Sequence, residues 1–171
     1  DVGGGSLELI NSNRGVLAET ASLPTGIVYL TERYLQNIPT PSSQVEACAG
    51  EILSMLKASS FSIPTDESVP IYGCGGVAVL ARFMCAGGEG EEGINGMTVP
   101  VCDVSKWVEK LSALNWENRS ALKGFERGRE DVALAGLIVL RELLRWLRKA
   151  EFRVFTRGVR EGVLIELFAN R

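Results

Sequence analysis

The first nine residues, DVGGGSLEL, place two carboxylates and a hydroxyl around three consecutive glycines. Glycine loses more conformational freedom on folding than any other residue, so a glycine triplet needs a compensating interaction. The triplet, Gly3 to Gly5, can turn tightly and present successive backbone N–H donors, and such a nest binds phosphate oxygens. The Ser6 hydroxyl adds a further donor. These residues, Gly3, Gly4, Gly5 and Ser6, therefore predict a phosphate-binding loop.

Two acidic residues, Asp1 and Glu8, flank this loop. An ionised carboxylate only accepts hydrogen bonds, so it does not bind phosphate directly. It can instead hold a divalent cation that bridges to phosphate, and Mg²⁺ favours one or two carboxylates together with water and phosphate oxygens. Residues of equal parity lie on one face of a strand, so Ser6 and Glu8 should point the same way. The alternative is a glycine-rich hairpin whose acids are merely solvated.

A second glycine segment, GCGGVAVLA at residues 73–81, lies between a predicted strand and a predicted helix. The N-terminus of a helix attracts anions through its dipole and its free N–H groups. We therefore predict that Gly75 and Gly76 also contact phosphate, although an ordinary strand–helix turn is the alternative. Several arginines in the second half of the chain could line an anion track, or could equally be surface or ion-paired residues: Arg119, Arg127, Arg129, Arg157 and Arg160.

The composition argues against several classes of function. There is no histidine, and the four cysteines form no C-x-x-C pair, which argues against zinc and removes Ser-His and Cys-His catalysis. The net charge of −3 argues against nonspecific nucleic-acid binding. No apolar run approaches the roughly 20 residues of a membrane span. Scattered cysteines beside apolar residues are typical of reduced thiols, so we expect a cytoplasmic protein.

The elements that must position these residues form an α/β pattern within one domain. Residues 6–10 and 15–23 predict a hairpin, and Asp1–Val2 predict the end of an earlier strand. Ser43 and Glu46 form a capping-box pattern that predicts the start of a helix. Further helices are expected near residues 77–84, 104–114, 131–150 and 163–169, with strands at residues 69–72 and 152–156 and an acidic loop at residues 87–93.

Four segments, taken together, resemble the exopolyphosphatase / guanosine pentaphosphate phosphohydrolase family of the actin, sugar-kinase and heat-shock ATPase superfamily. They are DVGGGSLEL, YGCGGVAVLA, RGREDVALAGLIVLRELL and VFTRGVREGVLIEL, in the order of the family's motifs. The first motif is shared with heat-shock-type ATPases, whereas the closing RGVREGVL is specific to the family.

The resemblance implies a ribonuclease-H-like (actin-like ATPase) domain with a central mixed five-stranded sheet and helices on both faces. It implies that residues 1–171 form the second domain of a two-domain enzyme. The implied activity is Mg²⁺-dependent removal of terminal phosphate from polyphosphate or guanosine pentaphosphate by a water nucleophile. Asp1 and Glu8 would be the catalytic, metal-linked carboxylates. The missing first domain would supply the general base, so the chain alone should be inactive.

Departures from the family pattern keep other functions open. Cys74 and Val77 stand where the second loop usually carries threonine, and Asn95 stands where many members have histidine. The alternatives are a non-catalytic module that senses a phosphorylated ligand, and an ATPase of the same superfamily. Without its partner domain the chain should also expose an abnormally apolar face, which either stays exposed or drives homodimer formation.

Overall fold

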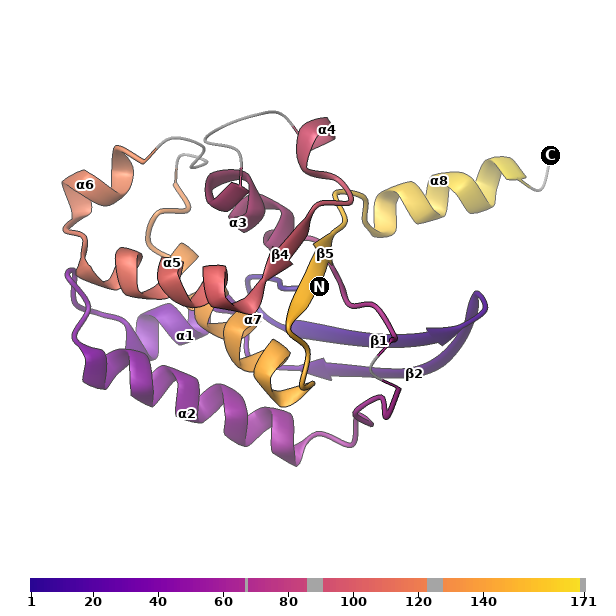
Figure 1. Cartoon of the computed structure of the whole chain (residues 1–171), viewed down its shortest axis with the longest axis horizontal. Helices are drawn as coiled ribbons and strands as arrows, with labels where there is room; N and C mark the ends of the chain where they lie inside the picture. Colours follow the sequence, from indigo (N-terminus) through magenta and orange to yellow (C-terminus); the bar gives the residue numbers. More distant parts are fainter. Residues whose placement is uncertain (67, 86–90, 123–127, 170–171) are drawn as a thin grey trace.

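The structure, a computed structural model, describes residues 1–66, 68–85, 91–122 and 128–169 (Figure 1). It shows an α/β arrangement with two small sheets and a central helix, α7 (Ala133–Trp146). Helix α7 packs against α1 (Ile27–Tyr34), α2 (Ser42–Ala58), α3 (Gly76–Cys85) and α5 (Val101–Ala113). Most of its residues are buried, as its run of apolar residues from Val132 to Leu140 predicts.

The predicted hairpin is confirmed. Strand β1 (Leu7–Asn13) pairs antiparallel with β2 (Val16–Leu23). The turn holds only Arg14 and Gly15, whose φ angles are 50° and 79°. A two-residue hairpin turn with positive φ at both positions matches the twist of the flanking strands, and glycine adopts such a φ without steric cost. The turn is therefore tighter than the predicted five-residue segment Asn11–Gly15.

The second sheet has the strand order β3-β5-β4, formed by β3 (Tyr72–Gly73), β4 (Thr98–Pro100) and β5 (Glu151–Val154). The central strand β5 is parallel to β3 and antiparallel to β4. Strand β4 is three residues long, and no sequence pattern predicted it.

The expected central five-stranded sheet is not confirmed, because in the part of the chain that the structure describes the two sheets are joined by bridges at Val2 alone. This residue forms an isolated antiparallel bridge to Leu7 of β1 and an isolated parallel bridge to Gly75, just after β3. A single residue cannot carry the ladder of hydrogen bonds that a full strand provides. A cavity of about 370 Å³ accordingly lies between β1 and the segment that contains β3.

Several helix starts differ from the sequence expectation: α5 begins at Val101 rather than near residue 104, and the last helix, α8 (Val159–Ala169), begins at Val159 rather than near residue 163. Helix α2 begins at Ser42 with Pro41 as N-cap and without a side-chain cap bond, so the predicted capping box of Ser43 and Glu46 is wrong. Two short helices, α4 (Glu91–Ile94) and α6 (Trp116–Ser120), were not predicted. Residues 87–90 of the predicted acidic loop lie outside the described residues, and α4 includes Glu91 and Glu92 from its second half.

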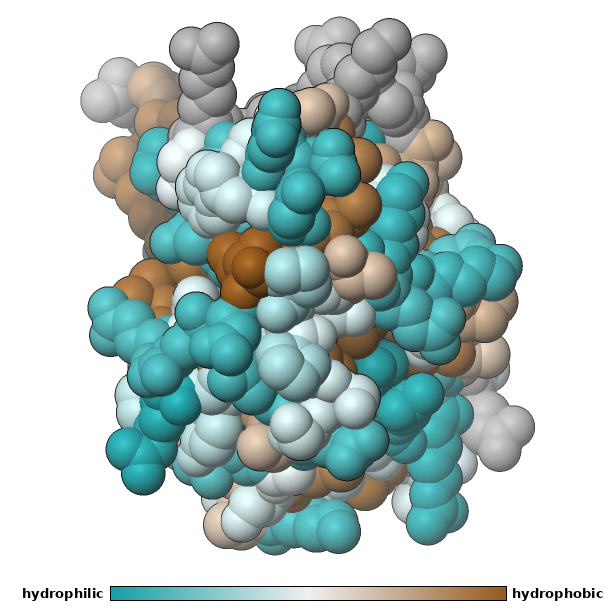
Figure 2. Space-filling model, turned by 90° about the vertical axis from the view of Figure 1, so that its left-hand side faces the viewer, coloured by the Kyte–Doolittle hydropathy of each residue, from teal (hydrophilic) through white to brown (hydrophobic). Residues whose placement is uncertain are grey.

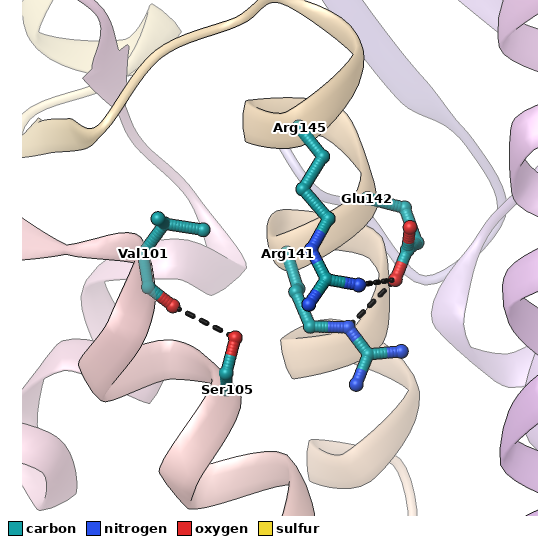
Figure 3. Close-up of polar contacts among 5 residues, drawn as sticks. All are labelled: Val101, Ser105, Arg141, Glu142 and Arg145. Carbon is teal, nitrogen blue, oxygen red and sulfur yellow. Dashed lines mark hydrogen bonds and ion pairs between the residues drawn. The ribbon is translucent and has the colours of Figure 1, made fainter.

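One buried charge cluster lies on α7, and Figure 3 shows its geometry. The Glu142 carboxylate, whose side chain is 4% exposed, accepts from Arg141 Nε at 2.6 Å and from Arg145 Nη1 at 3.2 Å. The Arg145 side chain is half-exposed, whereas that of Arg141 is largely buried. Two cations therefore compensate the one carboxylate inside the packed helices.

The last helix, α8 (Val159–Ala169), projects away from the rest of the fold (Figure 1). None of its described residues is buried, and it exposes six large apolar side chains: Val159, Val163, Leu164, Ile165, Leu167 and Phe168. In contrast, the opposite end of the molecule is largely hydrophilic, with apolar side chains showing only in small areas (Figure 2). None of the helices within the described ranges is long and apolar enough to cross a membrane.

Candidate functional site

The N-terminal glycine loop packs against the start of α1 through its carbonyl groups. Gly3 and Gly4 accept hydrogen bonds from the amides of Ile27 and Val28, and Gly5 accepts from Gly26. These bonds satisfy N–H groups that the first turn of a helix otherwise leaves free. A Cβ at Gly26 would lie 2.1 Å from the Gly4 carbonyl oxygen, so only glycine permits this approach. The start of α1 is therefore occupied by protein groups.

The amides of Gly4 and Gly5 are the loop donors that remain. The Gly3 amide donates to the Ser6 carbonyl at 2.9 Å. Gly4 and Gly5 are exposed, and their amides have no hydrogen-bond partner in the part of the chain that the structure describes. Two adjacent, solvent-facing N–H groups can bind an anion without breaking a protein hydrogen bond.

Ser6 and Glu8 lie on the same face of the chain, as their spacing predicts. The Ser6 hydroxyl donates to Glu8 Oε1, and the Ser22 hydroxyl of β2 donates to the same oxygen at 3.3 Å. The proton of Ser6 is thus directed at Glu8 rather than at a ligand. Ser6 therefore orients the Glu8 carboxylate. Both hydroxyls donate to Oε1, so neither of these two hydrogen bonds involves Oε2.

Asp1 lies against the second glycine segment. The amino nitrogen of Asp1 donates to the Glu8 carbonyl oxygen at 2.9 Å, and the Glu8 amide donates back to the Asp1 carbonyl at 3.0 Å. Gly75 has a φ of +61°, and a Cβ there would lie 2.0 Å from Asp1 Oδ1. The glycine therefore makes room for the Asp1 carboxylate.

Gly76 has a different role in the structure from that of Gly75. Its amide donates to the Val2 carbonyl at 3.1 Å, and a Cβ at Gly76 would lie 2.4 Å from the same oxygen. This donor is already used inside the protein. The Gly75 amide, by contrast, has no partner among the described residues. The second loop thus offers one backbone donor, at Gly75, instead of the two that the sequence predicted.

One pocket of about 630 Å³ brings these parts together. Its wall includes the two glycine segments, the starts of α1 and α3, and Gly128, Arg129, Asp131 and Val132, which lead into α7. The chemically relevant lining residues are Asp1, Gly3, Gly4, Gly75, Gly76, Arg129 and Asp131. Asp1 also lines the neighbouring 370 Å³ cavity, where Glu8 lies.

Two of the lining residues were not predicted as members of this site. Arg129 was proposed only as one of several anion-binding arginines, and Asp131 only as a helix start. The signal that could have found them is their shared motif, R-x-D, directly before the buried helix α7. Among the described residues, the other proposed arginines do not line the pocket: Arg119 is buried, and Arg157 and Arg160 lie beside or in α8. Arg127 lies outside the described residues.

The residues present suit a hard cation with few protein ligands. The candidate carboxylates are those of Asp1, which lines both cavities, and Glu8, which lines the 370 Å³ cavity. Within the described ranges, no group of three or more potential metal-binding side chains comes together. Mg²⁺ retains several waters and is usually held by one or two carboxylates plus substrate phosphates, so this donor set fits it. A Ca²⁺ or Zn²⁺ cage would need more protein ligands.

The fold and the site define the chain as an α/β domain with a glycine-lined pocket. Comparison with known proteins identifies the family within this class. The sequence matches the Ppx/GppA phosphatase family over residues 1–171. The chain belongs to this family, which confirms the resemblance seen in the four motifs.

Relatives agree with this assignment. Exopolyphosphatase 2 of Mycobacterium tuberculosis is 28% identical over 175 residues, covering 98% of this chain and 54% of the relative. A crystal structure of the Aquifex aeolicus Ppx/GppA family member is 28% identical, with a TM-score of 0.88 over 99% of this chain and 55% of that one. An exopolyphosphatase from Cytophaga hutchinsonii, 21% identical with a TM-score of 0.81, shares the fold. The chain spans about half the length of the curated relatives it matches.

Proposed function

We propose that this chain forms one wall of a site that hydrolyses phosphoanhydrides, removing terminal phosphate from inorganic polyphosphate or guanosine pentaphosphate. The observation that carries the proposal is the convergence of Asp1, the Gly4 amide, Gly75 and Arg129 on one pocket. A carboxylate beside backbone donors and a guanidinium is the combination that a metal-bound phosphate chain requires. In this proposal residues 1–171 are the second, ribonuclease-H-like domain of a larger enzyme.

Each group has a part in binding the terminal phosphate. In this proposal the Gly4 amide on the pocket wall and the neighbouring Gly5 amide donate to phosphoryl oxygens, and the guanidinium of Arg129, which lines the same pocket, donates as well. Asp1 holds Mg²⁺, with Glu8 completing the ligand set directly or through water. Charge neutralisation at the phosphoryl oxygens is the chemistry that Mg²⁺ supplies when bound. The Ser6 hydroxyl keeps the Glu8 carboxylate in place.

Two parts of the reaction lie beyond this wall. An attacking water needs a general base within hydrogen-bond reach, and the family resemblance assigns that base to the first domain. Closure of a second domain over the pocket also excludes bulk water and strengthens the electrostatic contacts. The isolated chain should therefore bind phosphate chains weakly and turn them over very slowly.

The test is phosphate release by the intact enzyme with Mg²⁺, using polyphosphate, guanosine pentaphosphate and ATP in parallel. Wild type is compared with Asp1→Asn and with Asp103→Asn, a control on exposed α5 whose carboxylate pairs with Lys106. We expect release from at least one of the first two substrates, a loss of about 100-fold or more in Asp1→Asn, and no change in the control. Hydrolysis of ATP alone would support the ATPase alternative, and binding without hydrolysis would support the sensing module.

A further inference from the structure

Arg119 is a charged side chain that is fully buried without an ion-pair partner among the described residues. Its exposed fraction is 1%, which makes it one of the largest fully buried residues of the described chain. No carboxylate forms an ion pair with it within the described ranges, and its Nε has no partner there. Burial lowers the pKa of the guanidinium, and the negative charge of Asp131 opposes this effect without cancelling it. Burying an unpaired ion is costly, so its two remaining contacts should matter.

Both contacts are to backbone carbonyls of other segments. Nη2 donates to the Leu111 carbonyl at 2.8 Å, and Nη1 donates to the Glu130 carbonyl at 3.4 Å. Leu111 lies in the last turn of α5, where carbonyls lack a helical partner and carry partial negative charge. Glu130 lies in the segment that lines the 630 Å³ pocket. Arg119 therefore ties the end of α5 to the back of the pocket wall.

The segment that it holds is a short turn with internal bonds. Gly128 has a φ of +83°, and its amide donates to Glu130 Oε2 at 2.7 Å. The Arg129 carbonyl accepts from Ala133 in the first turn of α7 at 3.2 Å. These bonds fix the turn locally, but they do not connect it to α5 or α6. The bond from Arg119 to Glu130 supplies that connection.

We propose that Arg119 is a positioning residue of this pocket, holding the Gly128–Asp131 turn so that Arg129 and Asp131 stay on its wall. The proposal rests on the proposed function for its catalytic consequence but on the two carbonyl contacts for its structural basis. Arg119 lines no part of the pocket itself. The competing explanation is that Arg119 merely caps the end of α5.

Hydrogen exchange of the intact protein separates these explanations without any substrate. Arg119→Lys keeps the charge but cannot reach two carbonyls with a planar fork. Its matched control is Arg141→Lys, which changes another largely buried arginine, paired with Glu142 and absent from the pocket wall. We expect exchange of the Gly128 and Ala133 amides to rise about tenfold or more in Arg119→Lys and to stay unchanged in the control. A rise confined to the last turn of α5 would overturn the proposal.

Kinetics supply the second readout. Arg119→Lys should lower kcat/KM for polyphosphate about tenfold, at an unchanged fraction of folded protein. Combined with Asp131→Asn, its effect should be clearly less than additive, because both changes disturb one wall. Arg141→Lys combined with Asp131→Asn should be additive. Additive behaviour of the Arg119 pair would contradict the positioning role. If the wild-type enzyme is inactive, the proposed function is refuted. The role of Arg119 is still decided in that case, because the exchange measurement needs no activity.

Discussion

The carboxylate of Asp1 lies so close to Gly75 that a Cβ on Gly75 would be 2.0 Å from Oδ1. This contact joins the two glycine segments through residues that are 74 positions apart in the chain. It also explains why the second segment needs glycine at a position with φ of +61°. The proposed metal ligand therefore keeps its place only if Gly75 remains glycine.

Gly75→Ala should consequently displace Asp1 and lower phosphate release about 100-fold or more. It should also lower the free energy of unfolding by about 1–3 kcal/mol, because alanine is strained at this φ. The control is Gly50→Ala in α2, where a Cβ would meet no atom within 4 Å. That change should raise stability by about 0.5–1 kcal/mol and leave activity unchanged. Denaturant unfolding and a phosphate-release assay measure both effects, and a fully active Gly75→Ala enzyme would contradict the assigned geometry.

The buried Glu142 should contribute to stability but not to catalysis. Glu142→Ala leaves the largely buried Arg141 without its carboxylate, so the free energy of unfolding should fall by about 3 kcal/mol. Arg145→Ala should cost less than about 1 kcal/mol, because this side chain is half-exposed. Urea unfolding of both variants checks the difference. Equal losses in the two variants would show that the cluster is not held as Figure 3 draws it.

The rate at which each cysteine reacts with a thiol reagent should depend on how deeply its side chain is buried. Desolvation raises the pKa of the Cys48 thiol to about 12, and its side chain is fully buried, whereas Cys102 is exposed. Between pH 8 and about 10, iodoacetamide should modify Cys102 and leave Cys48 unmodified until the protein unfolds. Because the pKa of Cys48 in the folded protein lies above the ordinary thiol value of 9.0, ionisation of this thiol in the unfolded chain should lower the free energy of unfolding as pH rises from 9 toward 12. Native Cys48 labelling as fast as that of Cys102, seen by mass spectrometry, would be inconsistent with this packing.

The exposed apolar helix α8 should make the isolated chain self-associate. Single exposed apolar residues are normal on a protein surface, but α8 carries six large ones on one projecting helix, and such a concentration favours association. Sedimentation velocity of the 171-residue chain should show concentration-dependent association. Leu164→Glu with Ile165→Glu should abolish it, whereas Glu109→Gln on α5 should not. A monomeric wild-type chain at all concentrations would contradict this prediction.

Local patterns predicted the parts of the fold that depend on near neighbours. The hairpin of β1 and β2, although its turn is tighter than predicted, and helix α7 with its apolar run both depend on a few consecutive residues. The capping box failed because Pro41, outside the pattern, took the N-cap position of α2. Strand β4 was missed because three residues give too short a pattern.

The pocket was predicted only in part, because its wall is assembled over long sequence distances. Gly3 and Gly4 were recognisable as a loop, and Asp1 as its neighbouring acid. Arg129 and Asp131 join them only through the packing of α7, which local spacing does not reveal. The pairing of the Gly76 amide with Val2 likewise depends on a tertiary contact. The roles of these residues in binding phosphate and Mg²⁺ stay predictions.

The most direct test of the proposed site is a Mg²⁺ titration of phosphate release by the intact enzyme carrying Glu8→Gln. This change keeps the size of the side chain and removes its charge, and Glu109→Gln, on the exposed face of α5, is the matched control. We predict that Glu8→Gln shifts the Mg²⁺ midpoint upward about tenfold or more and abolishes most turnover, with a stability change within about 1 kcal/mol. The control should titrate like wild type. An unchanged Mg²⁺ midpoint and turnover in Glu8→Gln would mean that the first nine residues form a hairpin and not a metal-dependent site.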